Sequence, residues 1–438
     1  MGMTDYDVVV VGARCAGATL ATYLARSGAS VLLLDKDKQP SDQVVSTHTI
    51  HPPGIDVLDE IGVGEAVRQR SPATPTVRLR KNGAAVDFNF QDGRAEYCPR
   101  RQRLDGLLQE AAVRAGATFL DRTRVTGLLW DKDRVVGVQA VERGQERIFP
   151  TALVVGADGR RSTVADLVAA AEYLAYDAPR AMYWRYWETP GFWNTDSAYS
   201  SGMYIGRVGE DIRVVFQTDD NQLLIGSMPP MSRISFWRSE PLERLTHDLV
   251  EDPFIRPLIE ESRPEGHVRG TVRERYFFRN AAGPGWVLCG DAGHHKDFVI
   301  GDGITEALLQ AKTLAPAICS GLERSLYRWW RDRDVRALPL FFFAQDEARP
   351  GPIPDLVSLA FSHAAREPEL KARLARVLEH QLSPYEVFTP GNVFRWALAG
   401  ALRGRARLLS DFFQMGRRVS EVNRELRARK MLAAKERG

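Results

Sequence analysis

Cysteine is scarce in this chain, which has four in 438 residues. Cys15, Cys98, Cys289 and Cys319 are scattered, and no two of them form a C-x-x-C pair. This distribution indicates reduced thiols and a reducing compartment.

Long apolar runs are also missing. No stretch approaches the ~18 uninterrupted apolar residues of a membrane-spanning helix. Residues 1–7 lack the basic and apolar regions of a signal peptide, and Tyr6 stands where a myristoylation signal has Ser or Thr. We therefore expect a cytoplasmic protein without a transmembrane segment.

A strong excess of one charge is absent as well. The net charge of +3 is too small to predict nucleic-acid binding. With 44% hydrophobic and 26% charged residues, the composition is that of an ordinary globular protein, which excludes disordered and collagen-like chains. The length predicts two or three substructures, and we expect a monomer or a homodimer.

What the sequence does contain is a strand–helix–strand unit near its start. Residues 5–11 are an apolar, β-branched run, residues 15–27 have helical spacing, and residues 31–34 are a second buried run. The turn Gly12-Ala-Arg-Cys-Ala-Gly17 between the first strand and the helix is typical of dinucleotide-binding sites. The first glycine permits the tight turn, the last allows close packing, and the helix N-terminus offers N–H groups to a pyrophosphate.

We expect a dinucleotide cofactor to contact this unit. The predicted cofactor-binding residues here are Gly12, Ala13, Arg14, Ala16, Gly17, Asp35 and Lys36, with Asp35 accepting hydrogen bonds from the adenosine ribose. Arg14 departs from the fingerprint, because its position is usually glycine. An arginine there opposes close approach of the backbone to phosphate, although its guanidinium could supply charge directly.

Two further motifs follow along the chain. They are Gly156-Ala-Asp-Gly159, with Ser162, and Gly290-Asp-Ala-Gly293, which continues as HHKDFVIGDGITEAL. In this order and at this spacing, the three motifs resemble those of the group A flavin monooxygenases related to para-hydroxybenzoate hydroxylase. The resemblance covers about residues 5–315. It implies FAD as the cofactor and NADPH or NADH as a transient co-substrate, in line with the absence of a second dinucleotide fingerprint.

The resemblance also implies roles for single residues. Asp291 matches an aspartate that binds a ribityl hydroxyl of FAD, and Arg101 matches an arginine that reaches the cofactor from the start of a helix. Asp158 and Gly159 match a pair associated with both FAD and the nicotinamide nucleotide. Gly290 belongs to the same pair as Asp291, and Gly301, Gly303 and Ile304 match a loop and helix N-terminus that face the flavin pyrimidine.

Two positions depart from the family pattern. Phe298 stands where proline is usual, and Ala165 stands where arginine is common. The first difference reshapes the surface expected over the flavin. Both bear on the efficiency of flavin reduction and on nucleotide preference more than on FAD binding.

The remaining patterns suggest how the chain is organised. Alternating runs around Asn82-Gly83 predict a β-hairpin over residues 76–90, and residues 176–278 predict an antiparallel sheet with aromatic side chains on one face. We predict an α/β fold in which a Rossmann-type FAD-binding domain is interleaved with an antiparallel β-sheet substrate domain, followed by a C-terminal helical region. The expected ranges are 1–75, 96–175 and 279–320 for the first, 76–95 and 176–278 for the second, and 321–438 for the third.

Candidates for catalysis and substrate binding are few. His48 follows the second strand, which in this fold approaches the flavin, and an unperturbed His pKa near ~6.5 suits proton transfer. The alternative is a loop histidine hydrogen-bonded to backbone. Trp184 and Tyr186 share a strand face and, with Phe298, are candidates for the substrate pocket, although they could simply form the sheet core. His294 and His295 are adjacent and diverge, so we expect no metal site.

The resemblance implies an FAD-dependent monooxygenase. It would use NAD(P)H and O2 to hydroxylate or epoxidise a small organic substrate, aromatic or polyketide-like, through a C4a-hydroperoxyflavin. The alternatives are a reductase or a halogenase of the same fold, although the halogenase segment W-x-W-x-I-P is not matched by WRYWETP. A non-catalytic flavin-binding sensor or partner protein is an alternative of another class, motivated by Arg14 and Phe298.

The end of the chain is basic. Residues 391–438 contain 12 Lys or Arg and 4 Asp or Glu. Such a segment could bind an anionic membrane or a partner, but a solvated basic helix is the commoner case and the interpretation we prefer here.

Overall fold

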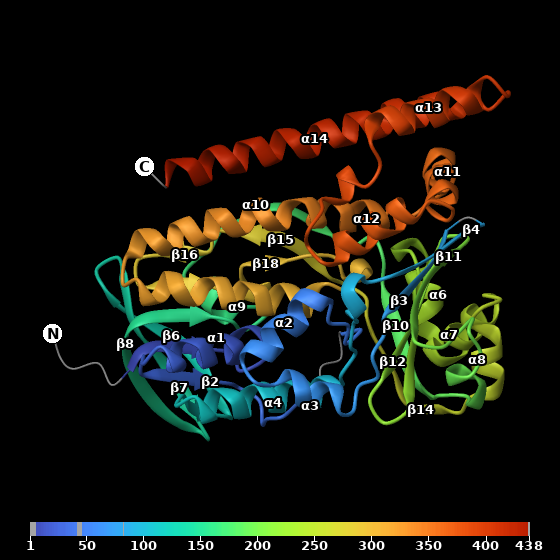
Figure 1. Cartoon of the computed structure of the whole chain (residues 1–438). Coiled ribbons are helices and arrows are strands. Elements are labelled where there is room, and N and C mark those ends of the chain that lie inside the picture. The colour runs from blue at the N-terminus through green and yellow to red at the C-terminus, as the bar shows by residue number, and fades with distance from the viewer. Residues whose placement is uncertain (1–5, 42–45, 82, 437–438) are drawn as a thin grey trace.

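The computed structural model describes residues 6–41, 46–81 and 83–436. Figure 1 shows two bodies side by side, each built on a β-sheet, with long C-terminal helices across the top. Asp5, at the start of the expected first strand, and Asn82, in the expected hairpin turn, lie outside the described residues.

An eight-stranded sheet forms the first body. Its main path runs β16–β17–β8–β1–β2–β5, and β6 and β7 extend from β8 as an antiparallel arm. The strands are β1 (Tyr6–Val11), β2 (Val31–Leu34), β5 (Thr118–Leu120), β6 (Thr123–Asp131), β7 (Arg134–Glu142), β8 (Gln145–Gly156), β16 (Ala282–Gly283) and β17 (Trp286–Leu288). Strands β1, β2, β5, β8 and β17 are parallel, so their carboxyl ends meet at one edge of the sheet.

This register brings the three sequence motifs together. Val11 pairs with Leu34 on one side and with Gly156 on the other, and Leu288 also pairs with Gly156. The turns that follow these four strand ends therefore lie next to one another. In open α/β sheets this edge is where ligands bind.

Helices cover the first sheet, which explains why β1 is a continuous run of buried valines. The helices of this body are α1 (Cys15–Arg26), α2 (Pro52–Glu60), α3 (Gly64–Arg68), α4 (Arg101–Arg114), α5 (Thr163–Leu167) and α9 (Gly303–Cys319). Helix α1 packs between α4 and α9, and α2 also contacts α9. The N-terminal ends of α1 and α9 are thereby held near the carboxyl edge of the sheet.

A seven-stranded sheet in the order β14–β10–β13–β12–β11–β3–β4 forms the second body. Its strands are β3 (Thr76–Lys81), β4 (Ala84–Asn89), β10 (Met182–Glu188), β11 (Gly202–Val208), β12 (Asp211–Thr218), β13 (Gln222–Met228) and β14 (Pro264–Thr271). The antiparallel pairing of β3 with β4 confirms the expected hairpin. All pairs in the sheet are antiparallel except β3 with β11.

The expectation of aromatic side chains on one face of this sheet is wrong. Trp184 and Tyr186 lie in one hydrophobic core, while Tyr183 and Trp187 lie in a second core on the opposite face. The second face is covered by α6 (Ile234–Ser239), α7 (Pro241–Val250) and α8 (Arg256–Glu261), which the alternating pattern did not predict. A sheet covered on both faces needs apolar side chains on both.

A small three-stranded sheet and the C-terminal α-helices complete the regular structure of the described residues. The strands are β9 (Glu172–Asp177), β15 (Arg275–Arg279) and β18 (His294–His295). The helices are α10 (Glu323–Ala348), α11 (Asp355–Ala364), α12 (Pro368–Leu378), α13 (Pro390–Ala401) and α14 (Arg407–Lys435). No helix in the described part of the chain combines the length and apolarity needed to cross a membrane. The mixed α/β fold, with a parallel sheet, an antiparallel sheet and C-terminal helices, confirms the predicted fold class.

Candidate active site

A cavity of about 450 Å³ lies at the carboxyl edge of the parallel sheet. The predicted site residues that line it are Gly12, Arg14, Ala16, Asp35, Lys36, His48, Arg101, Asp158, Gly159, Asp291, Phe298, Gly301, Gly303 and Ile304. The predicted residues Ala13, Gly17, Gly290, Trp184 and Tyr186 are not among the described residues of its wall.

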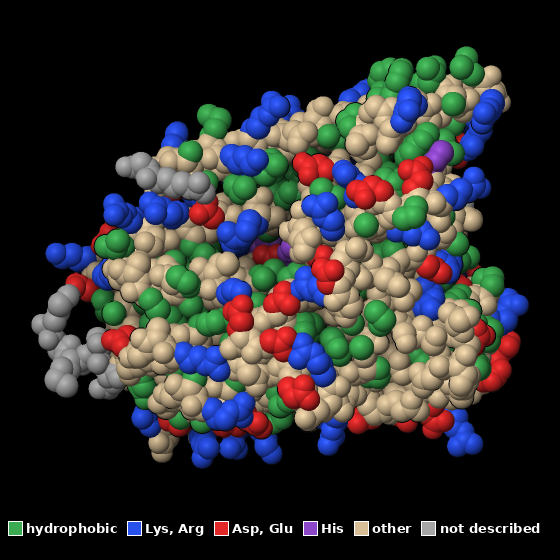
Figure 2. Space-filling model, in the orientation of Figure 1, with side chains coloured by type: hydrophobic (Ala, Val, Ile, Leu, Met, Phe, Trp, Pro, Cys, Tyr) green, Lys and Arg blue, Asp and Glu red, His purple; other side chains and the backbone are tan. Residues whose placement is uncertain are grey.

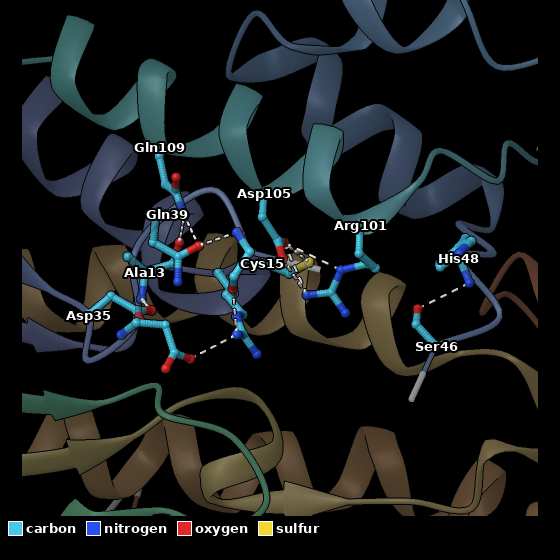
Figure 3. Close-up of polar contacts among 12 residues, drawn as sticks. Ala13, Cys15, Asp35, Gln39, Ser46, His48, Arg101, Asp105 and Gln109 are labelled. Carbon is cyan, nitrogen blue, oxygen red and sulfur yellow. Dashed lines mark hydrogen bonds and ion pairs between the residues drawn. The ribbon is translucent and has the colours of Figure 1, made fainter. Parts of the chain in front are cut away.

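The first glycine turn is held by packing and by one carboxylate. Gly12 has φ +102°, and a Cβ on it would lie 2.4 Å from the carbonyl oxygen of Ala157. A Cβ on Gly17 would lie 1.8 Å from the carbonyl oxygen of Gly12. The N–H of Ala13 donates to Asp35 Oδ2 at 2.9 Å (Figure 3). The end of β2 therefore fixes the turn that precedes α1.

Arg14, at the unusual middle position, is directed away from the turn. Its guanidinium donates to Asp37 Oδ2 at 3.1 Å and to Ser41 Oγ at 2.8 Å. The side chain thus ties the start of α1 to the loop after β2. A contact between this guanidinium and a cofactor phosphate stays a prediction.

Helix α4 supports the same turn from the side, as Figure 3 shows. Arg101 donates to both carboxylate oxygens of the fully buried Asp105, at 3.0 and 3.1 Å, and Asp105 is also contacted by Cys15 Sγ at 3.5 Å. Gln109 donates to the carbonyl oxygen of Ala13 at 2.8 Å. Burial raises the pKa of Cys15 to about 12, so its thiol stays protonated at neutral pH.

The second motif is organised by Asp158. Ser162 Oγ donates to Asp158 Oδ1 at 2.5 Å, and the N–H of Val164 donates to Oδ2 at 3.2 Å. Burial raises the pKa of this carboxyl. Gly159, with φ +81°, then turns the chain toward α5 at the cavity wall.

The third motif places one carboxylate at the cavity. The Asp291 side chain is 40% exposed, and its nearest described ionic contact is His295 Nε2 at 3.9 Å. Gly290 beside it has φ +65°, and its N–H donates to Gln310 Oε1 at 2.8 Å. A Cβ on Gly290 would lie 2.9 Å from the Ala16 side chain, so the two glycine motifs pack directly against each other.

The chain then enters helix α9 through a tight turn. Asp297 accepts a hydrogen bond from the N–H of Val299 at 3.1 Å, and Gly301 adopts a left-handed conformation with φ +65°. Helix α9 begins at Gly303, and both Gly303 and Ile304 line the cavity. The positive end of the helix therefore faces this space.

A buried ionic network supports the start of α9. Lys296 Nζ contacts Asp302 and donates to Glu306 Oε2 at 3.2 Å, and His380 Nε2 lies 2.8 Å from Asp302 Oδ1. Burial alone would raise the pKa of Asp302, but His380 and Lys296 hold it well below its usual value. Asp302, Glu306 and His380 could together ligate a cation. The Lys296 ammonium already occupies the contact with both carboxylates.

The two adjacent histidines of this segment diverge. His294 is buried and stacks on Phe278, with 4.3 Å between the ring centroids. His295 lies on the other side, against Tyr276 and near Asp291. Among the described residues, neither histidine belongs to the cluster of Asp302, Glu306 and His380 at the start of α9.

His48 connects the cavity to the second body. Its Nε2 is hydrogen-bonded to the hydroxyl of Tyr186 at 2.6 Å, and its ring also contacts Trp184 at 5.6 Å between centroids. The alternative of a ring bonded to backbone is therefore not what the structure shows. Trp184 and Tyr186 do share a face, as predicted, and they pack beneath His48.

The surroundings of His48 are basic. Burial lowers its pKa well below the usual value, and Arg101, Arg100 and Arg269 lower it further. The guanidinium of Arg100 lies 4.4 Å from the centroid of the Tyr186 ring, and that of Arg269 lies 5.6 Å away. His48 is therefore neutral at physiological pH. Its Nδ1 is buried and has no hydrogen-bond partner among the described residues.

Several wall residues were not singled out from the sequence. They are Thr47, Thr49, Met182, Lys296 and Asp297, together with the basic Arg124, Arg160 and Arg161 at the same cavity. Lys296 and Asp297 stand inside the third motif, so a signal for them was present. Met182 and Thr49 carry no sequence signal, because only the tertiary fold brings them to the cavity.

The cavity residues fit an FAD molecule. The Gly12 turn and the Asp35 carboxylate suit the pyrophosphate and the adenosine ribose, and the α9 N-terminus suits the flavin pyrimidine. The unpartnered Nδ1 of His48 is a buried polar atom at the cavity that a cofactor or substrate would satisfy.

Comparisons with known proteins agree with this fit. The family model described as "FAD binding domain" matches residues 5–320. Over 330 residues the chain is 26% identical to digeranylgeranylglycerophospholipid reductase of Methanocella arvoryzae, covering 70% of this chain and 75% of that protein. Over 168 residues it is 33% identical to 6-methylpretetramide 4-monooxygenase of Streptomyces rimosus, covering 37% of this chain and 40% of that protein.

A solved structure supports the fold alone. The flavin-dependent brominase Bmp2 has a TM-score of 0.73 at 16% identity, over 91% of this chain and 100% of that chain. The resemblance predicted from the three ordered motifs is confirmed by the family match over residues 5–320. The chain therefore belongs to the FAD binding domain family and is an FAD-dependent oxidoreductase.

Proposed function

We propose that this chain is a monooxygenase that acts on a small aromatic or polyketide-like molecule. The reaction would consume NAD(P)H, a proton, O2 and the substrate, and would give NAD(P)⁺, water and the oxygenated product. The observation that supports it best is the buried hydrogen bond between His48 and Tyr186, because this pair links the cavity to the second sheet.

Bound FAD would supply the transfer of electrons from the nicotinamide to O2. His48, held by Tyr186 at its Nε2, would accept a hydrogen bond from a substrate hydroxyl at its Nδ1. His48 has a lowered pKa and is neutral, while Arg100 and Arg269 beside the Tyr186 ring favour negative charge on an adjacent oxygen. A phenol held in this way would carry more negative charge on its oxygen, so its ring would be richer in electrons and more readily oxygenated.

The basic wall residues suit a transient nucleotide. Arg124 and Arg161 line the cavity and are exposed, and Arg160 beside them pairs with Glu274 Oε2 at 2.7 Å. Guanidinium groups at this position would bind the phosphates of NADPH or NADH. This agrees with the absence of a second dinucleotide fingerprint in the sequence.

A double-bond reductase is the second candidate. The similarity to digeranylgeranylglycerophospholipid reductase over 70% of this chain favours it. Such an enzyme would use the same cofactor but would not require O2. A halogenase is less well supported, because the similarity to the brominase concerns the fold alone and the segment WRYWETP lacks the halogenase pattern.

Incorporation of isotopic oxygen separates the two candidates. The holoprotein is supplied with NADPH or NADH, ¹⁸O2 and a panel of polycyclic phenols and prenylated lipids, and products are analysed by mass spectrometry. A monooxygenase gives a product heavier by one ¹⁸O atom. Saturation of a double bond that proceeds equally well without O2 would replace the proposal with the reductase.

Substitution of Tyr186 tests the proposed role of the His48–Tyr186 pair. Tyr186→Phe removes the hydroxyl bonded to His48, and we expect product formation to fall at least about a hundredfold. Tyr183→Phe is the matched control, because Tyr183 lies on the same strand but in the core on the opposite face. Equal product formation by the two variants would exclude the proposed role of the pair.

A further inference from the structure

Helices α13 and α14 form a C-terminal helical hairpin, residues 390–435, which we call the C-terminal arm. Its inner side packs on α11 through Val393, Ala397 and Leu408, which are buried together with Leu356. In Figure 1 the arm lies along the top of the molecule, with its turn at the upper right. The arm is therefore attached by one side, and its other side faces outward.

The outward side of the arm carries apolar side chains. Phe394 and Leu398 of α13 and Leu402, which caps its C-terminus in a helical conformation, recur every four residues, so they lie on one helix face. Phe413 of α14 joins this stripe through Phe412, whose ring centroid is 5.4 Å from that of Phe394 and 5.7 Å from that of Phe413. Leu402 is 81% exposed and Phe413 is 60% exposed.

The apolar stripe is unusual because its exposed side chains lie close together. Of the twelve exposed large apolar side chains in the described part of the chain, four lie in this stripe: Phe394, Leu398, Leu402 and Phe413. Exposed apolar residues that are scattered singly are ordinary on protein surfaces. A contiguous group marks a surface that binds another apolar surface.

Arginines surround the apolar stripe. Arg403, Arg405 and Arg407 lie at the turn between the helices, and Arg417 and Arg424 lie along the exposed side of α14. Among the described residues no carboxylate forms an ion pair with Arg403, Arg407 or Arg417, and Arg405 reaches Asp355 only at 4.0 Å. Figure 2 shows hydrophobic side chains gathered at the end of the arm with Lys and Arg side chains beside them.

We propose that the C-terminal arm binds the surface of an anionic phospholipid membrane. The apolar stripe enters the boundary between headgroups and acyl chains, and the arginines around it contact lipid phosphates. The arm lies on the membrane and does not cross it, in keeping with the lack of a spanning helix in the described chain. This proposal is independent of the substrate and of the choice between oxygenation and reduction.

The charge pattern favours a membrane over a second copy of this chain. In a symmetric dimer the same patch of both copies would meet, and the two sets of arginines would face each other. Like charges brought together in this way oppose association. An anionic surface instead attracts the arginines around the stripe while it accepts the apolar side chains.

Sedimentation with lipid vesicles tests the proposal. The full-length holoprotein is mixed with vesicles of phosphatidylglycerol and phosphatidylcholine in equal parts, or with vesicles of phosphatidylcholine alone. We expect the protein to sediment with the anionic vesicles, at least about tenfold more strongly than with the neutral ones, and to be released by high salt. No sedimentation with the anionic vesicles would overturn the proposal.

Paired variants locate the binding surface. Leu402→Asp with Phe413→Asp removes the apolar contact, and we expect binding to fall more than about tenfold. Ile148→Asp with Phe236→Asp is the matched control, since Ile148 and Phe236 are exposed by 60% and 53% elsewhere on the molecule. Arg403→Gln with Arg407→Gln should weaken binding by about fivefold per arginine. Flavin content and melting temperature of each variant report that it is folded.

Two other results of these experiments would contradict membrane binding by the C-terminal arm. Equal binding by the arm variant and its control would assign the vesicle contact to another surface and overturn the proposal. A dimer that forms without lipid and dissociates in the Leu402→Asp and Phe413→Asp variant would show that a second copy covers the patch. Light scattering of each variant in the absence of vesicles measures this.

Discussion

Among individual residues, Asp291 tests the cofactor site most directly. Its carboxylate lines the cavity, and among the described residues its ionic contact is His295 at 3.9 Å. Removal of the carboxylate should therefore change the free energy of unfolding little. We expect Asp291→Ala to weaken FAD binding by about tenfold or more, because the variant would lose the hydrogen bonds that the ribityl chain is predicted to donate to this charged group. Flavin absorbance per protein after purification measures this. Asp56→Ala, which removes the partner of Arg94 on the surface, should keep wild-type flavin content.

The four thiols should differ in reactivity. Burial raises the pKa of Cys15 and Cys289 to about 12, and it raises the pKa of Cys98 as well. Cys319 is exposed. We expect iodoacetamide to alkylate Cys319 alone in the folded protein and all four thiols in urea, as counted by mass spectrometry. Labelling of Cys15 in the folded protein would contradict the packing of α1 against α4.

At the level of helices, the start of α9 depends on one buried lysine. Lys296→Met would leave Asp302 and Glu306 as neighbouring buried carboxylates without their shared cation. We expect the free energy of unfolding in urea to fall by about 3–5 kcal/mol. Lys312→Met within α9 is the control, because Lys312 and its partner Glu60 are both about two-fifths exposed. That change should cost at most about 1 kcal/mol. Similar losses for the two variants would show that the network contributes no more than a surface pair.

The elements that follow continuous local patterns could be predicted from the sequence. Residues 31–34 form β2 as expected, and α9 begins at Gly303. Local patterns could not reveal the partners of single side chains. His48 meets Tyr186 across 138 positions, and His380 meets Asp302 across 78. These contacts depend on how two sheets and several helices pack, which periodicity does not encode.

At the scale of the whole molecule, we expect the free energy of unfolding to depend on pH because Asp297 titrates differently in the folded and unfolded states. Burial raises its pKa to about 7, whereas an unfolded Asp titrates near ~3.9. Between these values the folded state alone holds the proton, so the free energy of unfolding falls as pH rises from about 4 to about 7. Asp297→Asn can still accept from the N–H of Val299 but cannot titrate. As pH rises from about 4 to about 7, we expect the free energy of unfolding of this variant to increase relative to that of the wild type by roughly 3–5 kcal/mol, as measured by urea unfolding. If the free energies of unfolding of the two proteins changed with pH in parallel, the raised pKa of Asp297 would be contradicted.

The cavity wall runs from Val11 to Ala307 in the chain, and this has a consequence for biosynthesis. During translation the glycine turn after β1 emerges about 290 residues before the positive end of α9 that closes the same cavity. The complete cavity can therefore hold the cofactor only after the start of α9 has left the ribosome. Before β17 and α9 are made, the parallel sheet is incomplete, and the nascent chain must avoid aggregation without help from bound flavin.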